Sequence, residues 1–200
     1  MFIKLLLYLY ICTGLAIDPN LDCPGIIIVP RDEWGSVIPK IDEELSETPK
    51  FVFIHHTESE TCSTQNTCEE YLRNLQLYDT NILGRKDVGM NFLIGGDGRI
   101  YEGRGWNTVG DHTPGYPQSI GISFIGNYDD FLPTSSMIKA AKNLLNCGVK
   151  KGTLDFEHSV NGHRDASCSH CPGNALHGEI STWSGFRIHD LSYRNCWEKK

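Results

Sequence analysis

Three residues of this chain are candidates for a zinc site. His55 ends an apolar run, His163 lies in the segment Asn161–Asp165, and Cys171 follows His163 by eight residues. A catalytic zinc site takes three imidazole or thiolate ligands and leaves a fourth position open to water. His55, His163 and Cys171 are therefore the leading candidates for zinc ligands, and His56 and His170 compete with them.

The spacing alone leaves other interpretations open. It lacks the short loop or single helix that makes a zinc finger recognisable. A histidine such as His55 is often a surface or hydrogen-bonded core residue, and Cys168 and Cys171 could both form disulfides. A Cys–His nucleophilic pair is a further alternative. Against it, a free catalytic thiol is vulnerable in an oxidising compartment, whereas zinc protects a bound thiolate.

The N-terminus indicates such an oxidising compartment. Residues 1–16 combine Lys4, the apolar run Leu5–Thr13 and a small-x-small cleavage site at Gly14–Ala16, which is the pattern of a secretory signal peptide. The apolar run is too short for a membrane anchor. We therefore expect a secreted, extracellular protein whose mature chain begins with a flexible segment, residues 17–22.

The cysteine count supports a metal-bound thiolate. The chain has eight cysteines, and Cys12 would leave with the signal peptide. The remaining number is odd, so in an oxidising medium at least one cysteine is free, paired between molecules or bound to metal.

Length and charge limit the function classes. The 200 residues suit a single domain, and no repeat or low-complexity tract divides them. The formal net charge is −7, and loss of Lys4 with the signal peptide takes it to −8. Because nucleic-acid binding needs a basic surface, this balance argues against a nucleic-acid partner.

Hydrophobic periodicity predicts the elements that position the candidates. Phe51–Ile54 is a buried strand running into His55, and Ser119–Tyr128 is a further strand. Asn91–Ile94 and Arg99–Glu102 form a hairpin around Gly95–Gly98. Helices are predicted over Cys68–Asn81, from a cap at Thr134 or Ser135 to Gly148 or Gly152, and from Pro172–Gly173 to about Trp183.

Strands that alternate with helices indicate an α/β single domain with a central mixed sheet flanked by helices. In the first helix, the spacing places Tyr71, Leu72, Leu75 and Tyr78 on the face toward the core.

Several long motifs resemble the peptidoglycan recognition proteins, which share the fold of the phage-type zinc N-acetylmuramoyl-L-alanine amidases. The resemblance covers about Cys23 to Trp183. Its motifs are Ile28–Trp34, Phe53–Thr57, Asn91–Trp106, Ser119–Asn127, Gly162–Asp165 and Cys171–Gly173.

The resemblance implies that His55, His163 and Cys171 are the zinc ligands, the same three chosen from the residues. The metal would activate water and polarise the amide between N-acetylmuramic acid and L-alanine. A family tyrosine is expected to donate its hydroxyl to the developing oxyanion, but this chain has Met90, which has no donor. Loss of one such donor costs about 10²–10³ in rate. Asp111 and Ser169 are candidate substitutes, and Ser169 is chemically better suited.

The resemblance also implies ligand-binding residues. Arg104 would pair with the extra carboxylate of meso-diaminopimelic acid, which favours peptidoglycan of that type. The dipeptide that helps the family discriminate between stem peptides aligns with Gly84–Arg85. The remaining expected contacts are His56, Thr57 and His112. For Arg85 and Arg104 the alternative is a solvated surface charge.

The other cysteines divide into pairs. Cys62–Cys68 and Cys23–Cys147 resemble bridges of the family, and Cys168–Cys196 is inferred from the two cysteines left over. The expected organisation is a recognition domain over 23–183 and a C-terminal extension over 184–200.

We therefore expect a secreted peptidoglycan-binding protein of innate immunity with zinc-dependent amidase activity weakened by Met90. The alternative is a non-catalytic receptor or opsonin that retains zinc.

Overall fold

The computed structural model describes residues 23–37, 43–188 and 191. The predicted signal peptide 1–16, the segment 17–22, and residues 189–190 and 192–200 of the predicted extension lie outside the described residues. Within the described part, no helix is long and apolar enough to cross a membrane.

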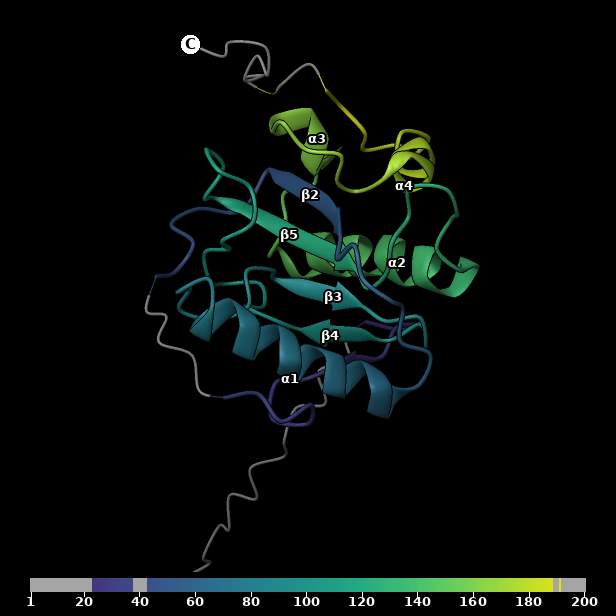
Figure 1. Ribbon diagram of the computed structural model, residues 1–200. Coiled ribbons are helices and arrows are strands. Elements are labelled where there is room, and N and C mark those ends of the chain that lie inside the picture. The colour runs from purple at the N-terminus through teal and green to yellow at the C-terminus, as the bar shows by residue number, and fades with distance from the viewer. Residues whose placement is uncertain (1–22, 38–42, 189–190, 192–200) are drawn as a thin grey trace, which may run out of the picture.

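A six-stranded mixed sheet forms the centre of the described domain (Figure 1). Its spatial order is β1-β4-β3-β5-β2-β6. β3 and β4 are antiparallel, and all other neighbouring strands are parallel. The strands are β1 (Ile28–Val29), β2 (Phe51–His56), β3 (Phe92–Ile94), β4 (Ile100–Glu102), β5 (Ser119–Phe124) and β6 (Ser159–Gly162).

Helices cover the two faces of the sheet unequally. α2 (Ser135–Lys151) packs on one face, and α1 (Gln65–Asn81) lies along β3 and β4 on the other (Figure 1). Two short helices, α3 (His163–Ala166) and α4 (Asn174–Ile180), follow β6. The face opposite α2 is therefore left without a long helix over β5 and over β2, the strand that carries His55.

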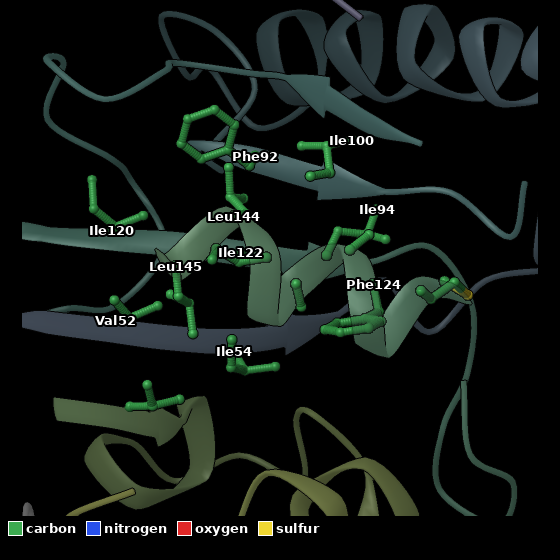
Figure 2. Packing of buried hydrophobic residues seen from close by; sticks show 14 of the residues in the cluster. Val52, Ile54, Phe92, Ile94, Ile100, Ile120, Ile122, Phe124, Leu144 and Leu145 are labelled. Carbon is green, nitrogen blue, oxygen red and sulfur yellow. The ribbon is translucent and has the colours of Figure 1, made fainter. Parts of the chain in front are cut away.

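Alternation along the strands divides the core between the two faces. Ile94 and Ile122 point to the α2 face, where they pack with Leu144 (Figure 2). Leu93 points the other way and packs with Leu72 of α1. This period of two fixes which side chains of β2 face the site: Ile54 is in the α2 core, so His55 lies on the opposite face.

The mixed α/β sheet with flanking helices is confirmed, as are the hairpin around Gly95–Gly98 and the helix capped by Thr134. Several predicted boundaries are wrong, and β2, for example, continues to His56 instead of ending at Ile54. α1 begins earlier, at Gln65, because the Thr64 side chain accepts from the backbone N–H of Thr67 and caps the helix. β5 ends at Phe124, not Tyr128, because the chain turns at Gly126, whose φ of 145° favours glycine. α4 ends at Ile180, before Trp183, where the chain tightens to i→i−3 hydrogen bonds.

The prediction for the buried face of α1 is partly wrong. Leu72 is fully buried, but Tyr78 is 52% exposed. Gln76 and Asp79 are buried instead. Gln76 Nε2 donates to Asp87 Oδ1 at 2.6 Å, and Asp79 Oδ2 accepts from the backbone N–H of Gly89 at 3.0 Å. These bonds hold the segment that follows the helix. The buried face of α1 therefore includes two polar side chains, whereas the apolar pattern predicted an apolar face.

Two disulfides link Cys23 to Cys147 and Cys62 to Cys68, the pairings that the resemblance implied. Cys168 is also disulfide-bonded. Its predicted partner, Cys196, lies outside the described residues, so that pairing stays a prediction. Cys171 is a free, buried cysteine.

Removal of the Cys23–Cys147 bridge by double alanine substitution is expected to lower the free energy of unfolding by about 2–5 kcal/mol. The bridge joins residues 124 positions apart, so it restricts the unfolded chain strongly. Urea denaturation measures the change. The Cys62–Cys68 bridge closes a loop of only 6 positions, and its removal is the control with the smaller expected loss. A larger loss from the short bridge would contradict this entropic account.

Candidate metal centre

Adjacent parallel strands bring His55 and His163 together. His55 lies near the end of β2, where it is 2% exposed. β6 pairs with β2 so that Gly162 lies opposite Ile54, and His163 is the next residue along the chain. The ring centroids of the two histidines are 4.5 Å apart. A strand end and the helix that starts beside it thus present two imidazoles to one point.

Cys171 reaches the same point from the loop between α3 and α4. Its Sγ lies 3.6 Å from His55 Nδ1 and accepts from the backbone N–H of His56 at 3.4 Å. One ligand atom from each of His55, His163 and Cys171 lies within 4.8 Å of the others. The structure therefore brings the three predicted ligand residues together.

Burial sets the protonation of these groups. The pKa of His55 lies well below its ordinary value, first because the ring is buried and then because three other histidines are near. Burial also lowers the pKa of His163 and raises the pKa of the Cys171 thiol to about 12. Both imidazoles are thus neutral and have lone pairs for a cation, while the thiol becomes a thiolate only with a nearby positive charge. The raised pKa of the Cys171 thiol and the lowered pKa of His55 both disfavour a thiolate–imidazolium pair, so they argue against a Cys–His nucleophile.

The donor set fits a metal ion. Two neutral imidazoles and one thiol are ligand types that zinc prefers, and three protein ligands leave a position open. His163 Nε2 is buried without a hydrogen-bond partner among the described residues. An unpaired buried nitrogen costs free energy, and a cation bound by this nitrogen would remove that cost.

Thr113 orients His55, and the sequence interpretation did not include it. Its Oγ1 lies 3.3 Å from His55 Nε2 and 2.8 Å from His112 Nδ1. This contact occupies Nε2 of His55 and leaves Nδ1, the nitrogen that faces Cys171, for a ligand. The one available signal was its place next to His112.

His112 covers β5 above the site. It is buried, and burial lowers its pKa to about 3. Its ring lies against Gly121, where any side chain would overlap it. Gly121 therefore lets the segment with His112 and Thr113 lie directly on the sheet.

The rival histidines lie elsewhere. His56 points to the opposite face of β2, where its Nδ1 accepts from the backbone N–H of Tyr128 at 3.3 Å and its Nε2 lies 3.2 Å from Glu58 Oε1. His170 is exposed and does not belong to the cluster. Neither completes the set of three.

Two of the three positions considered for an oxyanion donor, Met90 and Ser169, lie beside residues of the site. Met90 lines a cavity of about 110 Å³ together with Thr57 and Ser123, and Ser123 pairs with His55 in the β2–β5 register. Ser169 Oγ accepts from the backbone N–H of Cys171 at 3.0 Å, which leaves its own hydroxyl hydrogen to donate. Asp111 instead pairs with Arg85, its Oδ2 lying 3.3 Å from Nε.

Arg85 and Arg104 line a second cavity, of about 350 Å³, beside Gly84. Arg85 Nη1 lies 2.9 Å from Asp79 Oδ1. Arg104 donates from Nε to the carbonyl of Val88 and from Nη1 to that of Val109, each at 2.7 Å. Both arginines are therefore built into the walls of the cavity, which argues against solvated surface charges. A guanidinium has five N–H donors, so these bonds leave capacity for a ligand carboxylate.

A mixed sheet with a His/His/Cys cluster at the carboxyl ends of its neighbouring strands β2 and β6 defines an amidase-type α/β domain. Residues 45–174 match the family model described as N-acetylmuramoyl-L-alanine amidase. The chain is 44% identical to peptidoglycan recognition protein 1 of Mus musculus over 162 residues, which covers 80% of this chain and 89% of the relative.

Solved structures of peptidoglycan recognition proteins are similar to this chain as well. Human PGRP-IBETAC in complex with glycosamyl muramyl pentapeptide is similar at 38% identity and a TM-score of 0.79, covering 82% of this chain and 99% of that one. PGRP-LE in complex with tracheal cytotoxin, a monomeric diaminopimelic acid-type peptidoglycan, is similar at 37% identity and a TM-score of 0.79, covering 81% and 96%. This chain belongs to the peptidoglycan recognition proteins, within the N-acetylmuramoyl-L-alanine amidase family.

Proposed function

We propose that this protein is a secreted peptidoglycan recognition protein of innate immunity, a zinc-dependent N-acetylmuramoyl-L-alanine amidase whose turnover is slow. The observation that carries the proposal is the cluster of His55, His163 and Cys171, three ligand atoms within 4.8 Å of one another. A protein that only binds its ligand has no need of a metal site with an open position, whereas hydrolysis of an amide does.

Binding of the peptide stem is supported by the relatives and by the charge of the second cavity. Two similar proteins were solved with muramyl peptide or diaminopimelic acid-type ligands. Three basic residues, Arg85, Lys86 and Arg104, line the cavity in this chain beside two acidic ones, Glu43 and Asp111. A carboxylate on the stem would find charged donors there, because guanidinium groups pair with carboxylates through two parallel hydrogen bonds. We therefore propose diaminopimelic acid-type peptidoglycan as the ligand.

His55, His163 and Cys171 would hold the zinc ion. When bound, zinc supplies Lewis acidity toward a water molecule and toward the amide carbonyl. Thr113 keeps the His55 ring in the orientation that turns Nδ1 to the site. Ser169, whose Oγ accepts from the backbone N–H of Cys171, would donate its hydroxyl hydrogen to the oxyanion. Met90 has a thioether where the resemblance implies a phenol, so this position contributes no donor to the oxyanion.

The specific alternative is a receptor or opsonin that retains zinc without turnover. Met90 is the observation that favours it, because loss of one oxyanion donor removes roughly 3–4 kcal/mol of transition-state stabilisation. Binding of the stem peptide is common to both candidates. They differ in whether the muramoyl–alanine bond is broken.

The test is metal analysis of the purified protein combined with a release assay. Diaminopimelic acid-type muropeptide is added, and free stem peptide is measured by mass spectrometry with and without a chelator. About one zinc per chain and chelator-sensitive release are the expected results. Bound zinc and bound muropeptide with no release would establish the receptor instead. Release that a chelator leaves unchanged would contradict the metal mechanism.

A further inference from the structure

Arg164 joins the two parts of the chain that carry His163 and Cys171. It follows His163 in α3, and its backbone N–H donates to the carbonyl oxygen of Cys171 at 2.8 Å. Its Nη2 donates to the carbonyl oxygen of His170, and its Nη1 donates to Asn174 Oδ1 at 2.8 Å. Arg164 thus bonds to three points of one segment: the residue before Cys171, Cys171 itself and Asn174 after it.

The loop needs such external contacts because its own bonds are short in range. Ser169 donates its backbone N–H to the carbonyl of Ser167, and Gly173 donates to that of His170. These bonds shape the loop but do not fix its distance from His55. The backbone N–H of His56, which donates to Cys171 Sγ, ties the loop to β2, and the bonds from Arg164 tie it to β6, since α3 follows directly from that strand.

We propose that Arg164 is a positioning residue that holds the Cys171 thiolate where it can share a metal ion with His55 and His163. The inference rests on the proposed metal site and goes beyond it, because Arg164 is not a ligand. Its planar guanidinium reaches the His170 carbonyl and Asn174 together, which a single ammonium group does not. Hydrogen bonds from a charged donor are about twice as strong as neutral ones.

The expected effect is on metal affinity. Groups that orient metal ligands without binding the metal typically contribute about 10–100-fold in affinity. Arg164→Ala is therefore expected to weaken metal binding by about 10–100-fold. Arg164→Lys keeps the positive charge but loses the planar guanidinium that reaches two acceptors at once. Its metal affinity is therefore expected to fall between those of the wild type and Arg164→Ala.

The experiment uses the full chain and Co²⁺ as the probe. Cobalt affinity is measured by titration, and the thiolate-to-cobalt charge-transfer absorption shows whether Cys171 is bound. The control is Arg73→Ala, which removes another arginine that donates to a backbone carbonyl, that of Trp34, in a part of the fold away from the cluster. The control is expected to bind Co²⁺ as tightly as the wild type, with the same absorption.

Wild-type affinity and absorption in Arg164→Ala would overturn the proposal. If the alanine variant does not fold, wild-type affinity and absorption in Arg164→Lys would overturn it in the same way. An equal loss in Arg73→Ala would also overturn it, because the effect would then be general destabilisation. If the wild type shows no cobalt–thiolate absorption, the metal site itself fails. That outcome is distinct from the failure of Arg164 alone, which requires an intact wild-type signal.

Discussion

Cys171→Ser is expected to remove zinc and to reduce release of stem peptide by about 10³-fold or more. The substitution takes away the thiolate and leaves two imidazoles, too few to hold a catalytic zinc ion firmly. Lewis acidity is worth several kcal/mol in the transition state, which corresponds to a rate change of that size. Zinc per chain and the release rate are measured on the same preparation.

The matched control is His170→Ala, which changes the neighbouring residue on the same loop. His170 is exposed and lies outside the cluster, so about one zinc per chain is expected to remain. Muropeptide binding to the Cys171→Ser variant shows whether recognition survives without the metal. Full zinc content and full release in Cys171→Ser would contradict the proposed ligand set.

Met90→Tyr is expected to raise the amidase rate by about 10²–10³-fold, because it restores a phenolic donor at the position where the resemblance implies one. Met90 is half-buried and borders the small cavity beside Thr57 and Ser123, so a larger ring has adjoining space. The rate of stem-peptide release at saturating muropeptide measures the gain.

Met90→Phe separates the hydroxyl from the ring. It adds the same aromatic bulk without a donor, so its rate is expected to stay at the wild-type level. Equal gains in both variants would mean that packing, not hydrogen bonding, limits turnover. No gain in either would contradict the assignment of Met90 as the weak point of the site and would favour the receptor.

The sequence predicted the part of the site that depends on local patterns. The strand before His55 is an apolar run of strand-forming residues, and its period of two already separates His55 from Ile54. The pairing of His163 and Cys171 with His55 came from long motifs, because spacing alone could not bring distant segments together. Their convergence depends on β6 lying beside β2, which is a property of the whole sheet.

What the sequence did not predict shares a physical cause. β6 is the segment Ser159–Gly162, which has one large apolar residue and therefore no hydrophobic signal, although it is fully buried. Thr113 acts through a contact with His55 across 58 positions of sequence. Gln76 and Asp79 are buried in α1 because their partners arrive from the following loop. In each case the structure is set by hydrogen bonds to residues outside the element itself, which the periodicity of that element does not report.

β2 lies between β5 and β6, whereas Cys171 lies on a loop, so the two parts of the chain that carry the metal centre differ in how readily their backbones fluctuate. A strand hydrogen-bonded on both sides exchanges its amide protons only through large-scale unfolding, whereas a loop exchanges through local fluctuation. The backbone of Phe53 and Ile54, directly before His55, should therefore be among the slowest to exchange with deuterated solvent, and that of the Cys171 loop among the faster. Metal would then enter and leave through movement of the cysteine loop, while the histidine on β2 stays in place.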